Sequence, residues 1–104
     1  MTTHEYMADV ARTMRPGADV DHITEGVLGL TSEAGEVADL ILKGKWGQLV
    51  PTEKLVDELG DVLFYLTQLG ISCGYTLHGL MGSNVEKRKK RYPNGWSLIG
   101  SYHD

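Results

Sequence analysis

Apolar residues recur at spacings of three and four along most of this chain, which is the spacing of residues on one face of a helix. The pattern covers roughly residues 4–14, 23–43, 52–73 and 77–91. Breaks follow these stretches in turn at Pro16-Gly17, Gly44, Gly74 and Pro93-Asn94-Gly95. Strand-like alternation does not persist beyond a few residues. The sequence therefore predicts an all-α fold of about four helices, with the two long ones forming a hairpin at its centre.

Local signals predict where the long helices begin and end. Asp21 or Thr24 is a suitable N-cap for the second helix, and Thr52 is one for the third. Gly44 is a natural residue at which the second helix ends. In the loop that follows, Trp46 either covers apolar side chains or offers a stacking surface to a nucleobase.

The two long helices carry the same sequence motif, L-x-x-E-x-G-[E/D]-V-x-x-x-[I/L], once from Leu30 and again 25 residues later. Each copy is called an acidic phrase below. Each copy places two carboxylates at positions i and i+3, so both lie on one helix face, a turn apart. They flank the apolar stripes Ile23, Val27, Leu30, Ala34, Val37, Ile41 and Leu55, Leu59, Val62, Leu66, Leu69. Helices that pack through these stripes would bring four acids to one edge of the contact: Glu33, Glu36, Glu58 and Asp61.

Four carboxylates at one helix seam repel one another unless a cation lies between them. Oxygen ligands favour a hard cation, and magnesium is the abundant intracellular one. No histidine or cysteine stands in either phrase, which disfavours a zinc site and the Glu-x-x-His pattern of di-iron bundles. The sequence predicts that Glu33, Glu36, Glu58 and Asp61 bind Mg²⁺.

Each acidic phrase also contains a glycine in its helix interior, Gly35 and Gly60. Such a glycine costs about 0.5–1 kcal/mol relative to alanine. The close approach of another backbone or of a bound group would explain both. In the alternative interpretation the acids are only a solvated flank of the hairpin.

The last predicted helix begins apolar and turns polar, and Asn84, Lys87 and Arg91 continue its inner face at i, i+3 and i+7. An amide, an ammonium and a guanidinium on one face can bind phosphate oxygens. The alternative is a solvated basic helix end that complements the helix dipole.

Length, composition and charge disfavour several classes of function for this chain. A chain of 104 residues with 41% hydrophobic and 23% charged residues indicates one globular domain, residues 1–104. The net charge of −4 disfavours nucleic acid as a partner, and no apolar run is long enough for a membrane span. The single cysteine cannot form a disulfide within the chain, which suits a cytoplasmic protein.

Together the motifs resemble one family. Glu33-x-x-Glu36, Glu58-x-x-Asp61, Asn84-x-x-Lys87-x-x-x-Arg91-Tyr92-Pro93 and Gly95-Trp96 are similar to the MazG-like nucleoside triphosphate pyrophosphohydrolases. The resemblance covers residues 24–96. It implies an all-α MazG-like helical bundle that is completed by oligomerisation, as a homo-oligomer of two or four chains.

The resemblance also implies an activity, the hydrolysis of (deoxy)nucleoside triphosphates to the monophosphate and pyrophosphate. Glu33, Glu36, Glu58 and Asp61 would hold Mg²⁺, with Mn²⁺ as a substitute, and Glu33 or Glu36 would activate water. Lys87 and Arg91 would neutralise phosphate charge, and Asn84 would bind a phosphate or sugar oxygen. The competing hypothesis is a non-enzymatic helical oligomerisation or adaptor module.

Overall fold

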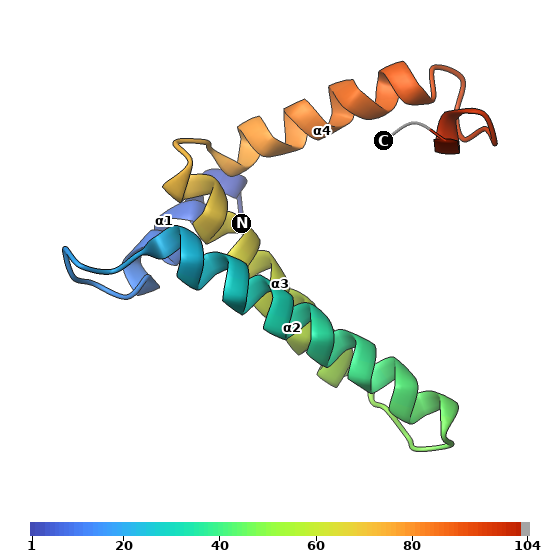
Figure 1. The fold of residues 1–104 in the computed structure, drawn as a ribbon, viewed down its shortest axis with the longest axis horizontal. Helices are drawn as coiled ribbons and strands as arrows, with labels where there is room; N and C mark the ends of the chain where they lie inside the picture. Colours follow the sequence, from blue (N-terminus) through green and yellow to red (C-terminus); the bar gives the residue numbers. More distant parts are fainter. Residues whose placement is uncertain (103–104) are drawn as a thin grey trace.

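Four α-helices make up the chain in the computed structural model, which describes residues 1–102 (Figure 1). They are α1 (Thr3–Thr13), α2 (His22–Lys45), α3 (Thr52–Ser72) and α4 (Leu77–Arg91), followed by a short 3-10 helix, η1 (Gly100–Tyr102). No strand occurs in residues 1–102, so the all-α prediction is confirmed. The predicted domain, 1–104, also includes His103 and Asp104, which lie outside the described residues.

Two of the predicted helix boundaries are wrong. Asp21 does cap α2, because its carboxylate accepts the backbone N–H groups of Ile23 and Thr24 at 3.1 and 3.0 Å. However, Thr52 is the first residue of α3 rather than its cap, and the capping position belongs to Pro51. Helix α2 also continues past Gly44, and the chain turns only at Gly47, whose φ of +84° suits glycine.

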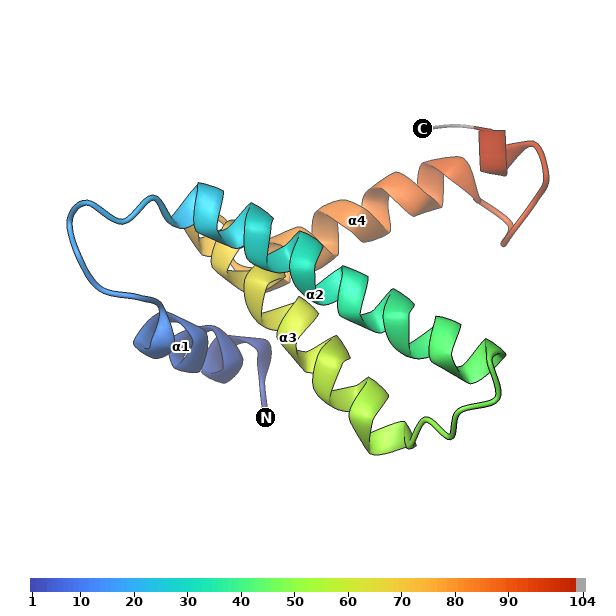
Figure 2. The same ribbon diagram turned by 60° about the horizontal axis from the view of Figure 1, so that its bottom comes forward.

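The hairpin of α2 and α3 is held together by close contact near one end. The two helices lie side by side in both views (Figures 1 and 2). A Cβ atom at Gly26 would lie 2.8 Å from the side chain of Leu69, and one at Gly29 would overlap the ring of Tyr65. The missing side chains at these two glycines therefore let Leu69 and Tyr65 pack directly against the α2 backbone.

The predicted apolar stripe of α2 is not the centre of this contact, although Leu69 of the α3 stripe takes part in it. On α2, Ile23, Val27 and Ile41 are 49%, 47% and 57% exposed, and on α3 Leu59 and Leu66 are 50% and 42% exposed. The expectation that the helices pack through the stripes is wrong for these positions. The reason is geometric: the α2 contact passes through Gly26 and Gly29, which lie to one side of the stripe. An apolar edge of the hairpin is left uncovered.

Gly35 and Gly60 differ from the two glycines of the contact. Apart from its chain neighbours and the nearby backbone of its own helix, a Cβ atom at either position would meet no atom of the described chain within 4 Å. No backbone within residues 1–102 approaches them, so the expectation of a close neighbour is not met inside the chain. Both glycines lie within the acidic phrases and face open space.

Helix α1 joins α3 to the beginning of α4. Val10 is 1% exposed there, and the sulfur of Met7 accepts the backbone N–H of Leu77 at 3.0 Å. Leu80 packs over Gly70, where a Cβ atom would lie 2.7 Å from it. Beyond this junction α4 turns away from the hairpin, and the chain takes the shape of an open C (Figure 1). No side chain of α4 is buried.

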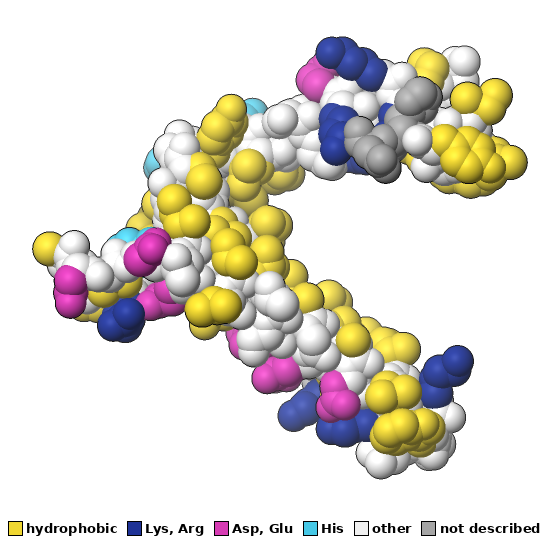
Figure 3. Space-filling model, viewed as in Figure 1, with side chains coloured by type: hydrophobic (Ala, Val, Ile, Leu, Met, Phe, Trp, Pro, Cys, Tyr) yellow, Lys and Arg dark blue, Asp and Glu magenta, His cyan; other side chains and the backbone are white. Residues whose placement is uncertain are grey.

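The open shape leaves an unusual amount of surface exposed. The radius of gyration is 16.6 Å, against about 13 Å for a compact chain of this length. The accessible surface is 7765 Å², about 2,000 Å² more than a compact monomer of this mass would have. Apolar side chains along the hairpin face the hollow of the C (Figure 3). None of the helices described is long and apolar enough to cross a membrane.

Candidate metal centre on the helical hairpin

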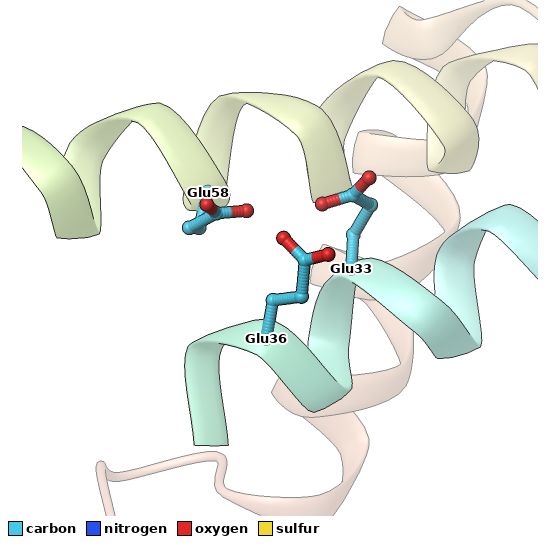
Figure 4. Close-up of side chains that lie close together, drawn as sticks. All are labelled: Glu33, Glu36 and Glu58. Carbon is cyan, nitrogen blue, oxygen red and sulfur yellow. The ribbon is translucent and has the colours of Figure 1, made fainter. Parts of the chain in front are cut away.

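Three of the four predicted metal ligands converge between α2 and α3 (Figure 4). Glu33 and Glu36 extend from successive turns of α2, and Glu58 faces them from α3. Carboxylate oxygens of the three residues all lie within 4.8 Å of one another. Glu33 and Glu58 are half-buried, and Glu36 is exposed. The spacing of the two phrases thus places acids from both helices at one point.

Asp61, the fourth predicted ligand, is outside this group of three. It is exposed and lies one helical turn beyond Glu58 on α3. Its negative charge nevertheless contributes to raising the pKa of Glu36. Asp61 therefore belongs to the electrostatic environment of the cluster although its oxygens are not part of it.

The cluster is electrostatically unfavourable as it stands. Hydrogen bonding to Glu58, and next the negative charge of Glu58, raise the pKa of Glu36, while hydrogen bonding to Glu33 opposes the shift. One oxygen each of Glu33 and Glu58, Oε2 in both, is buried without a hydrogen-bond partner among the described residues. A buried acceptor without a partner costs about 1–3 kcal/mol, and more when it is charged. The cluster is thus short of positive charge.

The donor set fits a hard divalent cation. All the converging groups are carboxylates, which suit Mg²⁺ or Mn²⁺ better than zinc or copper. Mg²⁺ binds oxygens at about 2.1 Å, so opposite ligands lie about 4 Å apart, close to the spread of these oxygens. A cation here would also supply the two buried Oε2 atoms with a partner. The residues present therefore fit the ion that the sequence predicts.

The predicted phosphate-binding residues do not reach this cluster within one chain. Asn84, Lys87 and Arg91 lie on the part of α4 that extends away from the hairpin (Figure 1). The side-chain oxygen of Asn84 accepts a hydrogen bond from Arg88 Nε at 2.8 Å. Lys87 is exposed, whereas Arg91 is half-buried, and its Nε is a buried donor without a partner in residues 1–102.

Comparison with known families identifies the family to which the chain belongs. A sequence model of the MazG nucleotide pyrophosphohydrolase domain matches residues 22–96, most of the chain. The chain belongs to the MazG family. No curated protein and no solved structure matches it. The matched segment of this MazG chain contains both acidic phrases and the basic part of α4.

The sequence did not predict one neighbour of the cluster, Tyr6 of α1. This residue precedes the segment that matches the MazG domain. Burial, the charge of Asp9 and the charge of Asp61 raise the pKa of Tyr6, in that order of importance. Tyr6 thus lies near the Asp61 side of the MazG cluster. Its position four residues before the buried Val10 is the sequence signal that α1 turns it inward.

Trp46 does not cover apolar side chains. It lies at the C-terminal end of α2 and is 70% exposed. The interpretation of Trp46 as a lid over the hairpin is therefore wrong.

Proposed function

We propose that this MazG chain hydrolyses (deoxy)nucleoside triphosphates to the monophosphate and pyrophosphate in a magnesium-dependent reaction. One observation carries the proposal: carboxylate oxygens of Glu33, Glu36 and Glu58 lie within 4.8 Å of one another, and Glu33 and Glu58 each have a buried oxygen without a partner in residues 1–102. The family supports a nucleotide as substrate. The acid cluster supports a bound metal ion, which would neutralise the charge on the phosphates of the nucleotide.

Each acid has a distinct role in this proposal. Glu33 and Glu58 would hold Mg²⁺ or Mn²⁺ through their buried oxygens, with Glu36 beside them and Asp61 at the edge. When bound, such an ion polarises phosphate oxygens and stabilises the charge that develops on them. Glu36 is the exposed member of the cluster, so solvent reaches its carboxylate, which can accept a proton from the attacking water.

The bond changes define the products. A water oxygen attacks the α-phosphorus, and the bond between the α-phosphorus and the α–β bridging oxygen breaks. Pyrophosphate leaves with that oxygen, and the proton of the water passes to Glu36. Lys87 and Arg91 would neutralise charge on the phosphates, and Asn84 would position a phosphate or sugar oxygen.

A second copy of the chain would bring these two sets of residues together. Within one chain, the basic end of α4 extends away from the carboxylates (Figure 1). The chain also exposes about 2,000 Å² more surface than a compact monomer, while a typical stable interface covers about 800 Å² on each partner. The proposed enzyme is therefore a homo-oligomer, a dimer or a tetramer, in which the α4 face of one chain lies over the acids of another.

The test is hydrolysis of a panel of ribo- and deoxyribonucleoside triphosphates, with and without Mg²⁺, with the products resolved. We expect monophosphate plus pyrophosphate, and no turnover after chelation. Diphosphate plus phosphate would show that a different bond is cut and would refute the proposed reaction. No turnover of any nucleotide, together with no thermal shift on adding Mg²⁺, would favour the adaptor module instead. The cytoplasmic location stays a prediction.

A further inference from the structure

A cavity of about 460 Å³ lies at the far end of α4, away from the acid cluster. Its walls are Val85, Arg88, Lys89, Tyr92, Gly95 and Trp96. Val85, Arg88 and Lys89 come from one side of α4, and Tyr92 is the C-cap residue that follows this helix. Figure 3 shows basic and hydrophobic side chains gathered at this end of the chain.

The segment after α4 folds back and supports one wall of this cavity. Gly95 makes the turn, with a φ of +90° that favours glycine. Gly100 is then buried against the end of α4, where a Cβ atom would lie 2.6 Å from both the Arg91 carbonyl oxygen and the Tyr92 ring. Its backbone N–H also donates to the Ser97 hydroxyl at 3.1 Å. The Tyr92 ring is therefore held between the returning segment and the cavity.

The walls combine flat aromatic surface with two cations. The Trp96 residue is 74% exposed, so its indole ring is available for stacking. The Arg88 guanidinium is oriented by the hydrogen bond from its Nε to Asn84, which leaves its other N–H groups for a ligand. Lys89 is 3.5 Å from Glu86 in a pair that is 69% exposed on each side, and such a pair is weak.

We propose that this cavity binds a nucleoside monophosphate, with the base against Trp96 and the phosphate on Arg88 and Lys89. A planar ring with an attached dianion matches an aromatic wall beside two cations. A polynucleotide is the less suitable ligand, because the basic cluster spans one turn and the chain carries a net charge of −4. A single nucleotide needs no more than the two cations present.

This site adjoins the residues proposed to bind substrate phosphate, because Arg88 donates a hydrogen bond to Asn84, but other wall residues lie on a different part of α4. At about 100° per residue, Val85 and Lys89 lie about 120–160° around α4 from Lys87 and Arg91, whereas Arg88 lies about 60° from Arg91. No carboxylate is among the residues that line the cavity, so binding there requires no divalent cation. The inference therefore does not depend on the proposed hydrolysis.

Tryptophan fluorescence can test the site directly. The chain has two tryptophans, so a Trp46→Phe variant reports on Trp96 alone. Trp46 is far from the cavity and 70% exposed, so its replacement leaves the cavity intact. We titrate this variant with AMP in excess chelator, with adenosine and inorganic phosphate in parallel. We expect saturable quenching by AMP, at a concentration at least about 10-fold below any that adenosine requires.

Matched variants in the Trp46→Phe background separate this site from its neighbours. Arg88→Gln with Lys89→Gln should weaken AMP binding at least about 10-fold. Lys90→Gln, which changes an exposed cation outside the cavity, should leave it unchanged, and Glu36→Gln should do the same. Far-UV circular dichroism checks that each variant is folded. The proposal is overturned by absent or non-saturable quenching, by equal quenching with adenosine, by unaltered binding in the double variant, or by binding of an oligonucleotide alone.

Discussion

In the α2–α3 hairpin, negative groups are packed against one another, whereas the positive groups of α4 are exposed to solvent except for the half-buried Arg91. The hairpin gathers three carboxylates from two helices, and two of their oxygens are buried without a hydrogen-bond partner in the described part of the chain. Helix α4 ends instead with four basic residues in its last turn, beside the cavity that it shares with the segment after it.

The contrast shows that each region lacks what the other provides. Like charges are held at a helix seam only when the energy of packing or of a ligand offsets their repulsion. An exposed basic helix end, in contrast, is inexpensive because water solvates it. A bound cation therefore changes the electrostatic energy most in the hairpin. The role of α4 depends on which ligand or second chain contacts it.

Removing a buried carboxylate should have the largest effect. Glu58→Gln keeps the shape of the side chain but removes a charge from the cluster, so we expect turnover to fall by at least about 100-fold. The thermal shift on adding Mg²⁺ should be lost as well, because binding to the folded state is what produces it. Steady-state kinetics and thermal unfolding with and without Mg²⁺ measure the two effects.

Asp57→Asn is the matched control for this change. Asp57 is the neighbouring acid on α3, is exposed and lies outside the cluster, so the variant has the same net charge as Glu58→Gln. It should keep nearly all of the activity and the whole thermal shift. Equal losses in the two variants would mean that overall charge, rather than the cluster, controls activity.

Truncating the basic face of α4 should have a smaller effect of a different kind. We expect Lys87→Ala to lower kcat/KM by about 10- to 100-fold, because a cation that stabilises phosphate charge is lost. The Mg²⁺-dependent thermal shift should remain, since Lys87 is not part of the carboxylate cluster. Lys90→Ala, at an exposed position on the same helix, is the control and should change kcat/KM little. A thermal shift that disappears in Lys87→Ala would contradict the division of roles.

The smallest effect should be on the stability of the metal-free chain. The pKa of Glu36 is raised in the folded state, so its contribution to stability is present at low pH and is lost as the pH rises through the raised pKa. Glu36→Gln removes this loss, and in chelator near pH 7 it should unfold at a higher temperature than the wild type. The difference should shrink as the pH falls below the raised pKa. A less stable variant near pH 7 would show that the repulsion is not significant.

The sequence was sufficient to predict what depends on local periodicity. The all-α fold, the limits of α4 and the meeting of Glu33, Glu36 and Glu58 all follow from spacings of three and four residues. The exclusion of Asp61 from the cluster depends on how far the two helices are displaced along each other, and the sequence pattern does not encode that displacement.

The contact face of the hairpin could not be predicted from hydrophobicity. Gly26 and Gly29 have no side chain and do not contribute to the apolar pattern. Yet their positions determine where Leu69 and Tyr65 pack. As a result the apolar stripe of α2 remains half exposed, as at Val27. The direction of α4 was equally hidden, because it is set by the junction with α1, where the Met7 sulfur accepts the N–H of Leu77.

The most direct test of the account is to mix two inactive variants, Glu58→Gln and Arg91→Ala, and to measure nucleotide hydrolysis after their subunits have exchanged. If the acids and the basic face of one site come from different chains, about a quarter of the sites in the mixture combine two intact halves. The account therefore predicts that activity returns to about a quarter of the wild-type value, with monophosphate and pyrophosphate as products. Activity that stays at the level of the separate variants, although mixed oligomers have formed, would contradict it.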